Sequence, residues 1–266
     1  MMKAISHLLF LFLTFNSCRP IPGTQGTPEP LGENELMALV GGGVLPENLV
    51  AEIRDRGVAF HPDDYFGSQL RNAGADPAAA EAAYERELKV TAELDGAQSA
   101  NMAGPFQSLG RNALIQRDYA SAEKFFFRAV DVNEKVFGEG SDKVAYSLLD
   151  ASSVYVAQKD YAKAETYLLR ALNTEESLHG REGVDLLMPL ANVCALYDKW
   201  GKPDKLEPYN RQMIAVLEKQ FGANSPQLVS TLTSEAHTLR SLGRPKEATD
   251  VENRLASIRS ATMNPH

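Results

Sequence analysis

Two stretches of sequence, DYASAEKFFFRAV at residues 118–130 and DYAKAETYLLRAL at residues 160–172, share one pattern and begin 42 residues apart. Two weaker copies follow on the same spacing, KPDKLEPYNRQMI at residues 202–214 and RPKEATDVENRLA at residues 244–256. A repeat of this length marks an array in which each unit buries its apolar face against its neighbours. The sequence therefore predicts a solenoid over its C-terminal two thirds.

Each period contains a further amphipathic stretch before the quoted one, and a 3.6-residue helical period explains both. The earlier stretches share a large apolar residue, namely Phe106, Leu148, Leu190 and Leu232. Four residues later each has a small residue, namely Gly110, Ser152, Cys194 and Ala236. A large residue beside a small one lets a neighbouring helix approach closely. We therefore expect an all-α fold, an α-solenoid of stacked antiparallel helix pairs.

The limits of the array follow from the same alignment. Residues 77–97 align with the second helix of a unit and predict a degenerate half repeat, before four full units at residues 98–260 and a disordered tail at 261–266. Glycines that end each second helix predict left-handed caps, and they are Gly96, Gly138, Gly180 and Gly222. In the last unit, Glu235 and Glu252 occupy columns that are apolar or aromatic elsewhere. We expect both to face water, because a terminal repeat exposes its outer side.

These columns resemble the tetratricopeptide repeat family, in the long 42-residue form typical of kinesin light chain. The resemblance rests on the small column, on an aromatic or apolar residue three positions later, on glycines before the second helix, and on alanines within it. The residues after the small column are Ala113, Tyr155, Tyr197 and Leu239, and the glycines are Gly201 and Gly243. Over residues 97–260, the resemblance implies a right-handed superhelix whose first helices line a concave groove.

In that family the groove holds a peptide from a partner protein. Carried over column by column, the resemblance places seven side chains on the groove, namely Arg111, Asp150, Ser153, Asn192, Asp198, His237 and Arg240. Asn192 occupies the position where kinesin light chain repeats favour asparagine, whose amide can pair with a partner's backbone. The alternative for each side chain is a solvated helix face. We expect a protein or peptide partner in this groove.

Composition and charge exclude other classes. The 266 residues are 44% hydrophobic and 23% charged with a net charge of −8, and no basic run indicates nucleic-acid binding. The two cysteines and five histidines form no metal or catalytic pattern, so we expect no catalytic residue, metal or cofactor. The sequence favours a non-enzymatic scaffold or adaptor. A structural spacer in an envelope assembly and a regulatory or accessory subunit of an enzyme complex remain alternatives.

The N-terminus predicts export. Residues 1–18 combine Lys3, the apolar run LLFLFLTF at residues 8–15, and Ser17 before Cys18. The segment resembles a bacterial lipoprotein signal, which implies that Cys18 is lipidated and that the protein is an exported lipoprotein of the cell envelope, periplasm or membrane. An ordinary cleaved signal or an uncleaved anchor is the alternative. Residues 19–33, rich in proline and glycine, predict a flexible tether.

Residues 34–76 predict a small helical module before the array. Pro46 marks one helix start, and Asp63 caps a second helix that ends at Gly74. Gly41, Gly42 and Gly43 lack a following lysine and predict a turn instead of a phosphate loop. The stretch resembles an N-terminal helical motif of repeat proteins from Acidobacteria.

Overall fold

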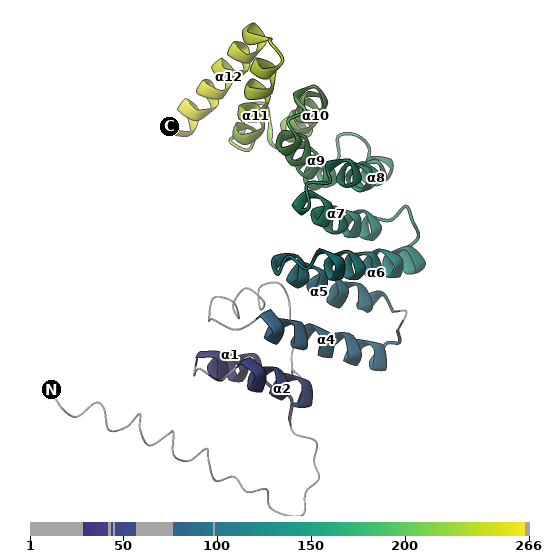
Figure 1. Ribbon diagram of the computed structural model, residues 1–266. Helices are drawn as coiled ribbons and strands as arrows, with labels where there is room; N and C mark the ends of the chain where they lie inside the picture. The colour runs from purple at the N-terminus through teal and green to yellow at the C-terminus, as the bar shows by residue number, and fades with distance from the viewer. Residues whose placement is uncertain (1–28, 42–43, 45, 57–76, 98, 264–266) are drawn as a thin grey trace, which may run out of the picture.

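The chain forms an elongated stack of helices, with α1 and α2 near one end and α12 at the other (Figure 1). The computed structural model describes residues 29–41, 44, 46–56, 77–97 and 99–263. Within these residues all regular structure is helical, which confirms the all-α prediction.

The helices follow one another as predicted pairs. Among the described residues, three helices precede the pairs, α1 (Glu33–Gly41), α2 (Pro46–Arg56) and α4 (Pro77–Leu94). The pairs are α5 (Ala103–Ile115) with α6 (Tyr119–Phe137), α7 (Asp142–Ala157) with α8 (Tyr161–His179), α9 (Leu187–Trp200) with α10 (Pro203–Phe221), and α11 (Leu228–Ser241) with α12 (Pro245–Met263). Single 3₁₀ turns, η1 (Ala100–Met102) and η2 (Val184–Leu186), lead into α5 and α9. We call α5, α7, α9 and α11 the first helices, and α6, α8, α10 and α12 the second helices.

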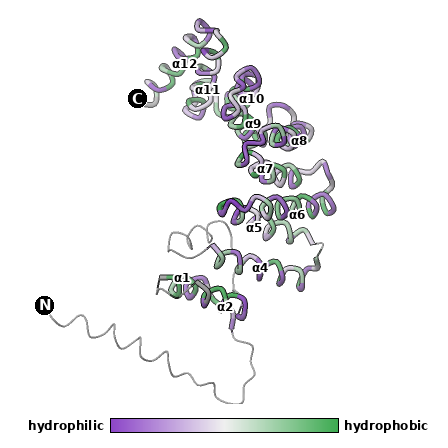
Figure 2. The backbone as a smooth tube through the Cα atoms, viewed as in Figure 1, coloured by the Kyte–Doolittle hydropathy of each residue, from purple (hydrophilic) through white to green (hydrophobic). Residues whose placement is uncertain are grey.

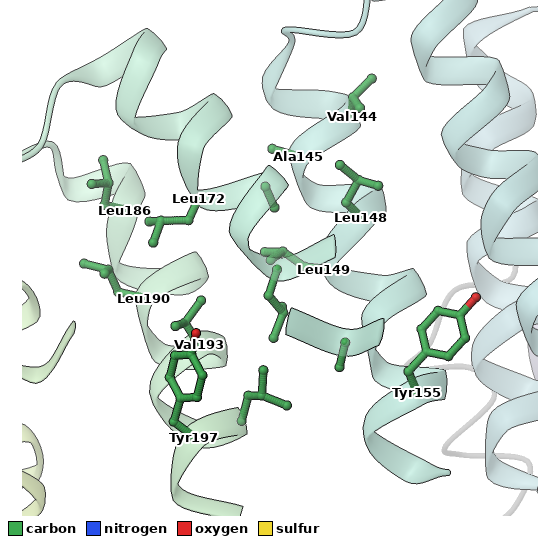
Figure 3. Close-up of a cluster of buried hydrophobic side chains, with 14 of the residues drawn as sticks. Val144, Ala145, Leu148, Leu149, Tyr155, Leu172, Leu186, Leu190, Val193 and Tyr197 are labelled. Carbon is green, nitrogen blue, oxygen red and sulfur yellow. The ribbon is translucent and has the colours of Figure 1, made fainter. Parts of the chain in front are cut away.

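The first helices form the inner layer of the stack. α5 contacts α7 directly and α7 contacts α9, while α6, α8 and α10 each pack on their own first helix and on the next one. Apolar and polar residues alternate along every helix of the array (Figure 2), as expected for helices that bury one face. In the core between the middle repeats, Leu148 of α7, Leu172 of α8 and Leu190 of α9 lie in one buried cluster (Figure 3).

The small column has the predicted role. A Cβ atom added to Gly110 would lie 2.7 Å from the ring atoms Cδ1 and Cε1 of Phe126 on α6. Phe126 is only 1% exposed, and the residues that follow it at 42-residue intervals are Leu168 and Asn210. The smallest member of the small column therefore faces the largest residue of the opposing column.

The glycine caps differ from the prediction in one torsion. Gly138, Gly180 and Gly222 have φ of 84°, 74° and 89°, but their ψ angles of 155°, 168° and 156° are extended instead of left-handed. This region of positive φ and extended ψ is open almost only to glycine. The left-handed conformation occurs instead in the turn within each pair, as at Gly201 with φ 66° and ψ 44°. The prediction that each of these glycines ends a second helix is confirmed, but the predicted left-handed ψ is wrong.

The ends of the predicted domains also need correction. Leu31 is 0% exposed and packs in a cluster with Leu36, Ile53 and Tyr84, so the packed module begins inside the predicted tether at 19–33. At the other end α12 continues to Met263, into the predicted tail at 261–266. Proline and glycine content predicted a tether over this stretch, whereas Leu31 at its end is part of a packed cluster. Cys18 and the helix predicted from Asp63 to Gly74 lie outside the described residues.

Candidate functional site: the inner face of the array

Two of the predicted groove residues meet across neighbouring first helices. Arg111 of α5 donates from Nη2 to Oδ2 of Asp150 on α7 at 2.8 Å, and Gln107 donates to the same oxygen at 2.9 Å. The two charged side chains remain 39% and 23% exposed. Since each charge has an internal partner, this part of the inner face presents a neutral, hydrogen-bonded surface.

The next two predicted residues make local hydrogen bonds. Ser153 donates from Oγ to the carbonyl of Asp150 at 2.5 Å, so its hydroxyl proton is used within α7. Asn192 of α9 is exposed and donates from Nδ2 to the carbonyl of Met188 at 2.9 Å. Its Oδ1 accepts no hydrogen bond from the described residues. Asn192 therefore keeps an acceptor that a bound backbone N–H could use.

The last three predicted residues belong to α9 and α11. Asp198 and His237 are exposed, and neither side chain has an internal partner within the described ranges. Arg240 instead forms a two-pronged pair with Glu252 of α12, with Nε–Oε1 and Nη2–Oε2 distances of 2.8 and 2.7 Å. The seven predicted residues thus lie along four helices and do not converge on one point.

A small pocket opens on this face between α9 and α11, with α10 at its floor. Its volume is about 210 Å³. It is lined by Ala191, Cys194, Ala195 and Asp198 of α9, Asn210 and Met213 of α10, and Ser230, Thr231 and Ser234 of α11. An opening between two first helices lies on the inner layer, which is the layer that the resemblance assigns to the groove. Asp198 is the one predicted residue that lines it.

Sequence reasoning missed the polar floor of this pocket. Asn210 is 1% exposed and donates from Nδ2 to Oγ of Ser234 at 3.1 Å and to Oγ1 of Thr238 at 3.3 Å. Asparagine replaces the leucine and phenylalanine of the earlier repeats at this column, and that change was the available signal. Met188, which is 54% exposed on α9, was missed as well. The inner face at α9 and α11 thus combines small, hydroxyl and apolar side chains.

Cys194 is half-buried and packs against the core of the middle repeats. Burial raises the pKa of its thiol to about 12, and the nearby Glu235 adds to the shift. A thiol with so high a pKa holds almost no thiolate at neutral pH. Glu235 itself is 3% exposed, which contradicts our expectation that it faces water. Its side chain lines a pocket between α10 and α12 and lies 3.5 Å from Arg211, so the terminal repeat buries this carboxyl group. Glu252, with a side chain 40% exposed, is at the surface as expected.

The described residues hold no candidate metal site. They contain no group of three or more His, Cys, Asp or Glu side chains placed to hold a metal ion. None of the helices in the described ranges is both long and apolar enough to cross a membrane.

Comparison with known proteins supports the repeat assignment. Residues 107–177 match the family model for the tetratricopeptide repeat. No curated protein matches the sequence. Among solved structures, BtubC (BKLC) from P. vanneervenii superposes with a TM-score of 0.65 at 20% identity, covering 88% of this chain and 89% of that one. TPR-like repeats assigned to a kinesin light chain of Podosopora anserina give a TM-score of 0.60 at 13% identity, covering 87% and 99%. The chain therefore has the fold of a tetratricopeptide-repeat solenoid, and its residues 107–177 match the sequence pattern of that repeat.

Proposed function

We propose that the chain is a non-enzymatic adaptor that binds an extended segment of a partner protein on the inner face between α9 and α11. The pocket of about 210 Å³ carries this proposal. Its small side chains, such as Ala191 and Ala195, let a partner's backbone come close. The free Oδ1 of Asn192 supplies an acceptor, and the exposed Met188 supplies apolar contact. Such repeat arrays commonly use their curved surface for binding.

The pairing of the arginines decides which variants can test this binding. Charge reversal at Arg111 or Arg240 would break the contacts with Asp150 or Glu252 inside the array. A loss of binding would then report damage to the fold. Ala195 is a better position, because it is exposed on α9 and lines the pocket.

The test uses a photo-reactive amino acid at Ala195, with the same amino acid at Ala162 as the control. Ala162 is also an exposed alanine and belongs to the second helix α8. Irradiation in extracts of the native cells, followed by mass spectrometry of the crosslinked peptide, should give one partner segment from Ala195. An Ala195→Arg substitution should remove binding of that partner. Equal crosslinking from both positions would contradict the proposal and favour the structural spacer.

We also propose that the adaptor works in the cell envelope, tethered through Cys18. The apolar run at residues 8–15 and the small Ser17 before Cys18 support this. Mass analysis of the mature N-terminus should show a lipid-modified Cys18. An unmodified terminus downstream of Cys18 would instead indicate a cleaved signal.

A further inference from the structure

The outer face of the array has grooves between neighbouring second helices, and aromatic rings fill them in the middle repeats. Between α6 and α8, Tyr155 of α7 stacks on Tyr167 with ring centroids 5.4 Å apart, and Phe127 meets the edge of Tyr167 at 5.2 Å. Between α8 and α10, Tyr197 of α9 stacks on Tyr209 at 5.6 Å. Both grooves are thus closed by large side chains.

The groove between α10 and α12 lacks these rings. The positions that follow Tyr197 and Tyr209 at the 42-residue interval hold Leu239 and Val251. The loss of ring volume leaves a pocket of about 400 Å³, which we call the α10–α12 pocket. Its lining is Arg211 and Ile214 of α10, Leu232, Glu235 and Leu239 of α11, and Glu247, Asp250, Val251 and Arg254 of α12.

Three other differences from the preceding repeat add negative charge to this pocket. Relative to the preceding repeat, valine becomes Glu235, lysine becomes Glu247 and proline becomes Asp250. Glu235 is the buried one of the three, because its column holds the core residue Val193 in the preceding repeat. Its Oε1 accepts from Nε of Arg211 at 3.5 Å, whereas its Oε2 accepts no hydrogen bond from the described residues. A buried carboxylate oxygen without a donor is costly, and a ligand that supplies a donor would remove the cost.

The arginines at the pocket are already paired with other carboxylates. Arg211 lies 2.7 Å from Glu207 and Arg254 lies 2.6 Å from Glu218, and neither glutamate lines the pocket. Glu247 forms an ion pair with Arg244, with a distance of 2.5 Å between Oε2 and Nη2. Asp250 is exposed and forms no ion pair with any described residue. The pocket therefore has excess negative charge, at the exposed Asp250 and at Glu235, which shares Arg211 with Glu207.

We propose that the α10–α12 pocket receives an arginine side chain of a partner protein. The apolar walls formed by Ile214, Leu239 and Val251 suit the hydrocarbon stem, and the guanidinium can donate to Glu235 and Asp250. Guanidinium is more weakly hydrated than ammonium and donates through a planar fork, so it suits a buried carboxylate better than lysine does. The pocket is on the outer face, so this proposal stands whether or not the inner face binds a peptide.

The experiment titrates the full chain with n-propylguanidinium and, as an uncharged control of the same shape, n-propylurea. Isotope-labelled protein should show amide shifts confined to α10, α11 and α12, with n-propylguanidinium binding about tenfold more tightly than n-propylurea. Glu235→Gln should weaken guanidinium binding by about the same factor. Glu182→Gln removes an exposed carboxylate from a different part of the surface and should leave binding unchanged.

A second variant tests the shape of the pocket. Val251→Tyr restores the tyrosine of the two preceding repeats, should fill the pocket and should abolish the shifts. Thermal unfolding reports whether Val251→Tyr folds. If it does not fold, the test rests on the isosteric Glu235→Gln variant alone. Equal binding of the guanidinium and the urea, no shifts at all, or unchanged binding by Glu235→Gln would each overturn the proposal.

Discussion

Glu175 is a carboxyl group buried between two repeats. It is 1% exposed, and neither carboxylate oxygen accepts a hydrogen bond from the described residues. Burial raises the pKa of this carboxyl, Asp142 and Asp185 raise it further, and His179, 3.4 Å away, acts in the opposite direction. At the equivalent position of the preceding repeat, Asn133 donates to the carbonyl of Lys143 at 3.2 Å and to Ser147 at 2.7 Å. This buried position therefore favours a side chain that donates hydrogen bonds, and an ionised carboxylate has no proton to donate.

Glu175→Gln should stabilise the protein at neutral pH by about 1 kcal/mol, the usual net value of one hydrogen bond. The folded pKa lies above the unfolded one, so the contribution of protonated Glu175 is present in acid and is lost as the pH rises through the folded pKa. The gain from the glutamine should therefore shrink between pH 7.5 and pH 5, as measured by urea unfolding. Glu176→Gln is the control, because Glu176 accepts from Gln212 and should not stabilise when replaced. Destabilisation by Glu175→Gln at pH 7.5 would contradict this account.

Gly110 is the residue at which the packing of the first pair is tightest. Gly110→Ala should destabilise the protein by about 1–3 kcal/mol, because its Cβ would lie 2.7 Å from the ring of Phe126. That cost exceeds the gain of about 1 kcal/mol in helix propensity. Gly104→Ala on the same helix meets nothing within 4 Å and is the matched control. Adding Phe126→Leu, the residue found 42 positions later, should recover part of the loss in urea unfolding. No recovery would show that the ring is not the cause.

At the scale of elements, the turn inside each helix pair repeats one backbone geometry with two kinds of residue. Arg117 and Lys159 have φ of 61° and 62°, and the equivalent Gly201 and Gly243 have φ of 66° and 72°. Each turn also has the same closing bond, such as the N–H of Asp160 to the carbonyl of Tyr155 at 2.8 Å. A side chain in this left-handed conformation costs about 1–2 kcal/mol, whereas glycine accepts it at no steric cost.

Lys159→Gly should consequently stabilise the protein by about 0.5–1 kcal/mol, since the relief of strain is partly offset by the greater freedom of glycine in the unfolded chain. Gly201→Ala should have the opposite sign and a similar size. The space around Gly201 is open, so its change measures backbone strain alone. Thermal unfolding of the two variants checks both signs. Changes of the same sign in both would contradict the strain argument.

The 42-residue period predicted the helix pairs and their order because propensity, periodicity and turn residues repeat together along the sequence. It could not predict which charges meet inside the array. Arg111 and Asp150 are 39 residues apart, and a column alignment places both on the groove without saying whether each faces a partner protein or the other. The prediction that Glu235 faces water was wrong for a related reason. The charge of the side chain suggested exposure, but its position lies on the buried side of α11.

The N-terminal module caps the array at the scale of the whole molecule. Leu31, Leu36 and Ile53 pack on the alanine-rich face of α4, and their cluster continues to Leu109 of α5. At the other end, Leu255 and Ile258 of α12 pack with Leu228 and Leu232 of α11. Within the part of the chain that the structure describes, each end therefore contacts only nearby helices. In such an array the stability is close to a sum of terms for each repeat and for each interface between neighbours.

A cavity at one end should thus loosen that end first. Ile53→Ala should cost about 2–5 kcal/mol at the α2–α4 interface, since Ile53 is 0% exposed. Hydrogen exchange should speed up in α1, α2 and α4 and stay unchanged in α11 and α12, because several repeat interfaces separate the two ends. Leu232→Ala is the matched variant at the far end and should give the reverse pattern. If either substitution speeded hydrogen exchange equally along the chain, the array would instead unfold as one cooperative unit. A partner bound near α11 would in that case stabilise the N-terminal cap as strongly as the repeat that it contacts.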